Sequence, residues 1–284
     1  MIFCMWPFTR SPVVPVLRFT GAIGMVTPLR PGLSIATLAE PLQKAFEMSK
    51  TPSVALIVNS PGGSAVQSSL ILKRIRALAD EFEKKVHVFC EDVAASGGYY
   101  IAAAGDEIFA EPSSILGSIG VISSGFGFVE AIEKLGIERR VYTAGRSKAI
   151  LDPFLPQKQE DIERLAALQR DAHDVFIGAV KERRAGKLKG PDAELFSGAF
   201  WSGKQALEYG LIDGISDIRT RMRELYGDDV KLKVVPTDRP GLLSRLRRTP
   251  SLDSLASLTT RDATLTDELL STLETRALWA RYGL

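Results

Sequence analysis

Ser96 is the residue whose position first suggests chemistry. It lies in the stretch AASGGYY (residues 94–100), between a strand predicted over residues 86–90 and an alanine-rich helix predicted over residues 97–104. Its hydroxyl could cap that helix, as serine often does. It could equally be exposed in the turn as a nucleophile. The turn by itself leaves both interpretations open.

A second glycine turn, NSPGGS (residues 59–64), follows the apolar stretch VALIVN, which is typical of a strand buried on both faces. Gly62 and Gly63 allow the backbone to take positive φ and to approach a ligand closely. Exposed N–H groups in such a turn could stabilise an oxyanion, although Pro-Gly-Gly is also a common tight turn. Successive strands of a parallel sheet end at the same edge. We therefore expect the two glycine turns to flank one cleft.

A serine nucleophile needs a base, and the two histidines are poor choices. His87 falls inside a predicted strand and His173 inside a predicted long helix, and neither has a spacing that recommends it. The G-x-S-x-G nucleophile pattern is also absent. A lysine can act as the base where burial lowers its pKa. Lys148 follows a strand predicted over residues 139–143 and precedes the apolar residues 149–151, but the sequence does not single it out among the lysines.

Strands and helices alternate through most of the chain. Strands are predicted at residues 13–19, 54–59, 86–90, 107–110, 120–123, 139–143 and 231–235, and helices at 35–48, 68–82, 97–104, 129–135, 158–183 and 205–209. This rhythm predicts an α/β fold with a mostly parallel sheet built from stacked βαβ units. We divide the chain into an N-terminal arm (1–13), one domain (14–236), and a linker with a C-terminal helix (237–284).

Composition excludes several classes of protein. A net charge of +2 over 284 residues gives no basis for nucleic-acid binding. Cys4 and Cys90 are expected to be free thiols, as in a reducing compartment. The apolar N-terminus (residues 1–8) is followed by Arg10, so we expect neither a transmembrane anchor nor a signal peptide. The expected location is cytoplasmic, and the apolar N-terminus provides a surface for peripheral membrane contact.

Four motifs in order resemble one family. NSPGG (59–63), ASGGYY (95–100), GSIGV (117–121) and GRSK (145–148) are similar to those of the signal peptide peptidase A family, serine–lysine proteases of the Clp protease/crotonase-like fold. ALEYGLID (206–213) is similar to the family's closing motif. The resemblance covers about residues 14–236. Each motif occurs once, as in the short form of the family, which assembles as rings.

The resemblance implies a role for each site residue. Ser96 is the expected nucleophile, Lys148 the general base, and Ser118 the residue that orients the lysine amine. The N–H groups of Gly63 and Gly97 are the expected oxyanion hole. No metal or organic cofactor is implied.

The implied activity is a serine endopeptidase that hydrolyses apolar peptides, such as signal-peptide remnants, through an acyl-enzyme. The implied partners are peptide substrates and further copies of the chain in a ring. A crotonase-like acyl-CoA enzyme and a catalytically silent scaffold remain as alternatives.

Overall fold

The computed structural model describes residues 11–24, 32–145, 147–237, 277 and 279–283. The predictions for the apolar N-terminus, Cys4, the linker and most of the C-terminal helix lie outside these residues.

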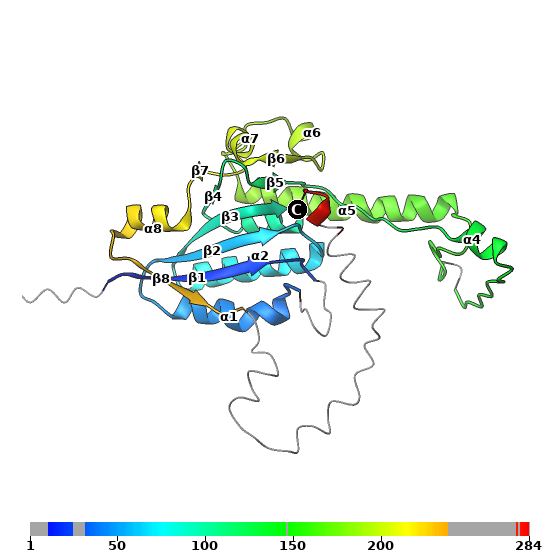
Figure 1. Ribbon diagram of the computed structural model, residues 1–284, viewed down its shortest axis with the longest axis horizontal. Helices are drawn as coiled ribbons and strands as arrows, with labels where there is room; N and C mark the ends of the chain where they lie inside the picture. Colours follow the sequence, from blue (N-terminus) through cyan, green and yellow to red (C-terminus); the bar gives the residue numbers. More distant parts are fainter. Residues whose placement is uncertain (1–10, 25–31, 146, 238–276, 278, 284) are drawn as a thin grey trace, which may run out of the picture.

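One sheet organises the described chain (Figure 1). Its strands are β1 (Val13–Thr20), β2 (Ser53–Ser60), β3 (Lys85–Ala95), β4 (Glu107–Ala110), β5 (Ile115–Gly117), β6 (Phe200–Ser202), β7 (Gly214–Ile215) and β8 (Lys231–Val235). The order is β6-β5-β3-β2-β1-β8, with β4 pairing β3 and β7. All pairs are parallel except β5 with β6. This confirms the predicted α/β class with a mostly parallel sheet.

Helices cover both faces of this sheet. They are α1 (Ile35–Glu47), α2 (Ala65–Glu81), α3 (Gly97–Ala102), α4 (Val129–Lys134), α5 (Gln159–Arg183), α6 (Asp192–Leu195), α7 (Gly203–Glu208) and α8 (Ile218–Tyr226). The larger core joins the sheet to α1, α2, α3 and part of α5. A smaller cluster on the opposite face packs Met222 of α8 against the sheet.

The central strands show why this sheet forms. Seven of the eight residues of β2 are buried, and β3 continues the pairing beyond the predicted strand to Ala95. β3 has this length because its first half pairs with β4 and its last three residues pair with β5. Ser96 therefore directly follows a strand that is paired with a neighbouring strand on each side.

Two predicted strands are wrong. Residues 120–123 and 139–143 form no strand, and nearly all of them are exposed. A strand is stable only where a neighbour satisfies its backbone N–H and C=O groups, and no described strand pairs with these residues. Residues 121–158, which we call the arm, include α4 and the segments on either side of it. In Figure 1 α4 lies at the end of the molecule far from the sheet.

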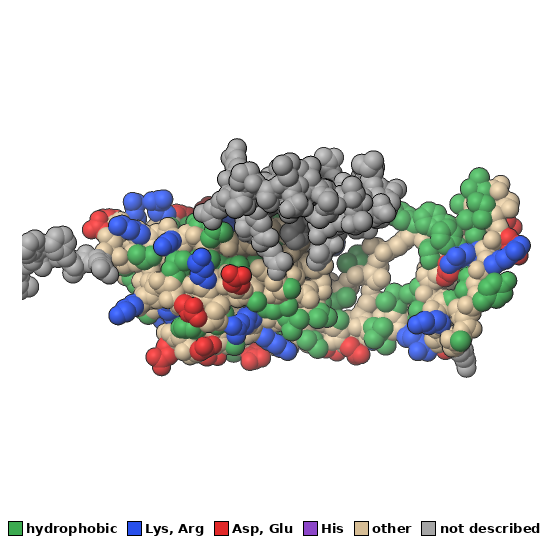
Figure 2. Space-filling model, turned by 90° about the horizontal axis from the view of Figure 1, so that it is seen from below, with side chains coloured by type: hydrophobic (Ala, Val, Ile, Leu, Met, Phe, Trp, Pro, Cys, Tyr) green, Lys and Arg blue, Asp and Glu red, His purple; other side chains and the backbone are tan. Residues whose placement is uncertain are grey.

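We call the described residues 11–120 and 159–237 the body. The arm exposes many apolar side chains, and Figure 2 shows them gathered on the part of the molecule that projects from the body. The large ones are Val121, Ile122, Phe126, Phe128, Leu135, Ile137, Val141 and Tyr142, with exposed fractions from 36% to 91%. No residue of α4 is buried. Among the described helices, none is long and apolar enough to cross a membrane.

Candidate active site

Ser96 has an unusual backbone conformation. Its φ is 52° and its ψ is −121°, a region that residues with a side chain rarely adopt. The N–H of Ser96 donates to the Gly117 carbonyl at 2.7 Å, and its own carbonyl accepts from Tyr100 N–H at 2.9 Å. Its side chain caps no helix N–H. The capping interpretation therefore finds no support, and strain of this kind is typical of functional turns.

The two glycine turns lie side by side, as predicted. A methyl group on Gly62 would lie 2.8 Å from the Ser96 Cβ and 2.9 Å from the Gly97 nitrogen. A methyl group on Gly97 would lie 3.3 Å from the Gly63 nitrogen. Gly62 and Gly63 have φ of 105° and 143°, which only glycine adopts readily. The short distances show why these positions are glycines: a side chain would fill the space beside the Ser96 turn.

The amides of Gly63 and Gly97 are the two predicted oxyanion donors. The neighbouring amides of this turn are engaged, since Gly62 N–H donates to Ser60 Oγ and Ser64 N–H donates to the Ile23 carbonyl. Within the described part of the chain, neither Gly63 N–H nor Gly97 N–H donates to a protein oxygen. Two unused donors beside a serine hydroxyl are what an oxyanion hole requires.

A cavity of about 980 Å³ opens beside Ser96. Pro61, Gly63 and Gly97 form one side of it, and residues 120–126 another. Tyr100 and Phe176 line it as a stacked pair with ring centroids 4.5 Å apart. Phe176 belongs to α5, for which the sequence analysis predicted only a helix over residues 158–183. Its place in the cavity wall could not be read from helical spacing.

Ser118 lies just after β5, at the same end of the sheet. It is buried, has a φ of 49°, and its N–H donates to the Ala199 carbonyl at 2.7 Å. His173 of α5 is half-buried, and its Nε2 donates to the Ile119 carbonyl at 3.0 Å. This hydrogen bond ties α5 to the segment that enters the cavity.

Lys148 is not brought to Ser96 within the single chain. It is exposed and lies in the segment between α4 and α5, outside the cavity lining. Within the arm, this segment packs against the residues just before α4. Phe128 N–H donates to the Pro153 carbonyl, and the Phe128 and Phe154 rings stack. At about 1.5 Å per residue, the first residue of α5 lies about 25 Å along the helix from Phe176. The buried apolar surroundings that the sequence suggested for Lys148 are absent here.

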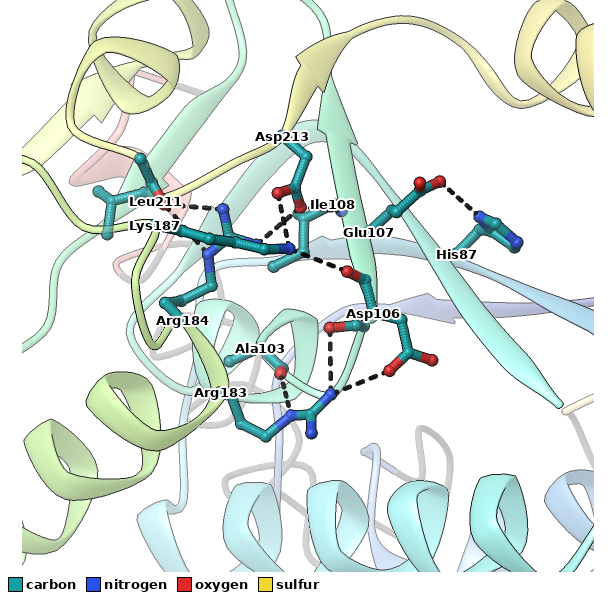
Figure 3. Close-up of polar contacts among 12 residues, drawn as sticks. His87, Ala103, Asp106, Glu107, Ile108, Arg183, Arg184, Lys187, Leu211 and Asp213 are labelled. Atoms are coloured by element: carbon teal, nitrogen blue, oxygen red, sulfur yellow. Dashed lines mark hydrogen bonds and ion pairs between the residues drawn. The ribbon is translucent and has the colours of Figure 1, made fainter. Parts of the chain in front are cut away.

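The other end of α5 is fixed by two ion pairs, one of which is made by the buried Arg184 (Figure 3). Arg184, which is 1% exposed, donates to Asp213 at 2.7 Å and to the Gly210 carbonyl at 2.7 Å. Lys187 contacts the same carboxylate at 2.8 Å. Burial acts to raise the pKa of Asp213, but hydrogen bonds from Arg184 and Lys187 hold that pKa below its ordinary value. These contacts fix the C-terminal end of α5 to the body and thereby the direction in which the helix extends to the arm.

A serine–histidine–carboxylate arrangement lies apart from Ser96, on β2, β3 and β4. His87 Nε2 is 3.0 Å from Ser53 Oγ, and His87 Nδ1 is 3.1 Å from Glu107 Oε2. Burial lowers the pKa of His87, while Glu107 acts to raise it. Ser53 and His87 are both buried, so no substrate reaches them. His87 is a packed strand residue, as the sequence suggested.

The other titratable groups that the structure describes form no second candidate site. Cys90 is a free, buried thiol, and burial raises its pKa to about 12. Among the described residues, no three His, Cys, Asp or Glu side chains come together as they would around a metal ion.

Comparison with known proteins adds independent information. The sequence profile of Peptidase family S49 matches residues 79–232, more than half of the chain. The chain is 32% identical over 213 residues to "Serine protease SPPA, chloroplastic" of Arabidopsis thaliana, which covers 72% of the chain and 31% of that protein. It is 33% identical over 180 residues to "Protease 4" of Haemophilus influenzae, covering 63% and 29% respectively.

A further relative has a different name. The chain is 57% identical over 273 residues to a protein of Brucella abortus (strain 2308) named "Na(+)/H(+) antiporter NhaA". The match covers 95% of this chain and 37% of the Brucella protein. The chain thus spans about a third of the length of these relatives, and the antiporter name is not transferred to it. From the S49 match together with the protease relatives, the chain belongs to Peptidase family S49, the signal peptide peptidase A family of serine peptidases.

Proposed function

We propose that this protein is an endopeptidase that cleaves apolar peptides with a Ser96–Lys148 dyad. The Ser96 Oγ attacks the peptide carbonyl and its proton passes to the neutral Lys148 amine, so that a C–O bond forms. The C–N bond then breaks, and Lys148 returns the proton to the leaving amine. Water hydrolyses the acyl-enzyme by the reverse proton route. Gly63 and Gly97 N–H groups stabilise the oxyanion in both steps.

One observation supports this proposal above all others. The strained Ser96 turn lies directly beside two backbone amides that donate to no protein oxygen within the described residues. An amide that is left without an acceptor next to a nucleophile is costly unless a ligand uses it. An oxyanion that forms during acyl transfer would use both amides.

The segment over the cavity supports a peptide as the substrate. Across the described hydrogen bonds, none involves the backbone of residues 120–127. Residues 120–126 line the cavity, and an extended peptide can pair with free backbone of this kind by adding a strand. The aromatic wall formed by Tyr100 and Phe176 suits apolar side chains of such a peptide.

The lysine in this proposal comes from a second copy of the chain. Lys148 lies on the arm, while Ser96 lies in the body, and the arm exposes an apolar surface that needs a partner. A ring of copies buries that surface and delivers each Lys148 to the cavity of a neighbour. Packing against the neighbour would also provide the burial that a lysine base requires.

Labelling with a fluorophosphonate tests the proposal. The full-length protein should react at Ser96, and mass spectrometry of the labelled peptide should locate the adduct. Ser96→Ala should abolish labelling and apolar-peptide hydrolysis, and Lys148→Ala should lower both by about 1,000-fold. Lys73→Ala, at an exposed position on α2, is the matched control. Full hydrolysis in Lys148→Ala would refute the dyad, and turnover of an acyl-CoA thioester without labelling would favour a crotonase-like enzyme.

A further inference from the structure

His173 supports one side of the cavity without belonging to its lining. Its Nε2 donates to the Ile119 carbonyl at 3.0 Å. On α5, Ala172 directly precedes His173 and Phe176 follows three residues later, and both of these neighbours line the cavity. Residues i and i+3 of a helix share a face. His173 and Phe176 therefore extend from the same side of α5.

Through these two residues α5 joins opposite sides of the cavity. On one side, the Phe176 ring stacks on Tyr100 of α3, with ring centroids 4.5 Å apart. On the other side, His173 holds Ile119, which directly precedes the cavity-lining residues 120–126. Both contacts come from within one turn of the same helix. Their spacing on α5 thus limits how far residues 120–126 can lie from α3 and the turn before it.

The Ile119 carbonyl is the last fixed backbone group before residues 120–127. The Ser118 N–H donates to the Ala199 carbonyl, and the Ile119 side chain is completely buried. Beyond this point, the described hydrogen bonds include none made by the backbone of residues 120–127. An extended chain directs its backbone and side-chain groups alternately to opposite sides. The direction of the Ile119 carbonyl therefore determines which of the following groups face the cavity.

We propose that His173 is a positioning residue, which fixes the register in which a peptide substrate pairs with residues 120–126. This inference rests on the proposed function, in which the peptide adds to that segment as a strand. A shift of one residue would turn every peptide side chain to the opposite face, so the aromatic wall would contact the wrong side chains. His173 Nε2 donates its hydrogen to the Ile119 carbonyl, and this nitrogen is not the base of the reaction.

Three variants separate the hydrogen bond from the rest of the side chain. In His173→Gln the amide nitrogen has about the reach of histidine Nε2, whereas in His173→Asn it is one methylene shorter. His173→Ala has no donor. Two substrates are compared with the full-length proteins. An internally quenched apolar dodecapeptide is long enough to pair with residues 120–126, and the p-nitrophenyl ester of acetyl-leucine reaches only the Ser96 turn.

The two substrates should respond differently. We expect His173→Asn and His173→Ala to lower kcat/KM for the dodecapeptide about tenfold, mainly through a higher KM. His173→Gln should stay within about twofold of the wild-type value, because the donor is kept. All four proteins should hydrolyse the ester within about twofold of the wild-type rate, because the ester makes no contact with residues 120–126.

A merely structural role of His173 would give another result. If the variants displaced α5 as a whole, Phe176 would move away from Tyr100, and His173→Asn would lose activity on both substrates in parallel. That outcome would overturn the proposal. So would a dodecapeptide KM in His173→Asn equal to that of the wild type, or a loss in His173→Gln as large as that in His173→Ala.

The bonds that are cut give a second readout, which a loss of stability would not change. Mass spectrometry of the dodecapeptide products should show the same cleavage sites for the wild-type and His173→Gln proteins. His173→Asn and His173→Ala should produce additional cuts at neighbouring bonds, because the register is no longer fixed. An identical set of products from all four proteins would also overturn the proposal.

Failure of this role and failure of the peptidase can be told apart. If a fluorophosphonate labels Ser96 in all four proteins and they hydrolyse the dodecapeptide equally, the positioning role falls and the peptidase stands. If Ser96 resists the fluorophosphonate and no protein hydrolyses either substrate, the proposed function falls, and the role of His173 falls with it.

Discussion

The body and the arm contain similar apolar side chains but place them in opposite environments. In the body, Leu17, Phe19 and Leu56 are completely buried between the sheet and its helices. In the arm, Phe126 and Tyr142 are 82% and 91% exposed. The body therefore buries these apolar side chains within the chain, while the arm leaves them exposed, as is typical of a surface that binds another molecule.

The residues of the proposed site are divided in the same way. The body holds Ser96, Ser118 and the Gly63 and Gly97 amides in turns fixed by parallel strands. The arm holds Lys148. A chain that can fold its body alone would then gain activity only on assembly. Assembly would keep peptide hydrolysis from occurring in isolated chains.

The largest expected effect comes from placing a charge on the arm. Tyr142→Asp should weaken association between copies by about 100-fold, or about 2.8 kcal/mol, because an unpaired carboxylate would be buried at the contact. Peptide hydrolysis at low protein concentration should fall in parallel, while the melting temperature of the body stays the same. Light scattering and hydrolysis measured over a dilution series check this.

The control for that variant lies on the body. Val234→Asp introduces the same charge at an exposed position of β8 and should leave both association and hydrolysis unchanged. If both variants behave alike, the arm is not the surface that joins the copies.

A smaller effect is expected from the ion pairs that fix α5. Asp213→Asn replaces the carboxylate partner of the buried Arg184 guanidinium with a neutral amide and should lower the free energy of unfolding by about 2 kcal/mol. Chemical denaturation followed by circular dichroism measures this. A change below about 0.5 kcal/mol would show that these contacts do not hold the end of α5.

The same variant has a defined pH dependence. The pKa of Asp213 in the folded protein lies below its ordinary value of 3.8. A carboxylate with a lowered pKa stabilises the fold above the unfolded value, and this contribution is lost as the pH falls through the folded value. The difference in unfolding free energy between the two proteins should thus be constant above about pH 5 and smaller at about pH 3. A difference that grows on acidification would contradict the assignment.

The smallest effect is expected at an exposed pair of the body. Arg18 contacts Glu91 at 2.6 Å, but the two side chains are 50% and 37% exposed. Arg18→Ala should change the free energy of unfolding by less than about 0.5 kcal/mol, because water screens such pairs. If Arg18→Ala lowers the free energy of unfolding as much as Asp213→Asn does, then burial does not decide how much an ion pair stabilises this fold.

The sequence predicted the body well because its pattern is local. The continuous apolar run of β2 and the glycines at 62–63 and 97–98 indicated strand ends at one edge, and the structure confirms their proximity. The pairing of β3 with both β4 and β5, which extends β3 to Ser96, depends on contacts between distant segments. A single strand's composition does not reveal such contacts.

The arm was predicted less well for a physical reason. Residues 120–123 and 139–143 have strand-forming side chains, but no neighbouring strand is present to pair with them. Lys148 precedes apolar residues, yet adjacency in sequence does not bury a side chain that projects on an arm. The contact of Tyr282 with Ala95 joins residues that are 187 positions apart in the chain, and no local signal marks it.

Mixing two inactive variants tests the central claim, that Ser96 and Lys148 act from different copies. Ser96→Ala and Lys148→Ala proteins are co-refolded at equal concentrations, and hydrolysis of an apolar peptide is compared with each variant alone. If each site takes its serine from one copy and its lysine from the next, about a quarter of the sites in a randomly mixed ring regain both groups. We predict about a quarter of the wild-type activity. No recovery in oligomers that demonstrably contain both variants would contradict the account.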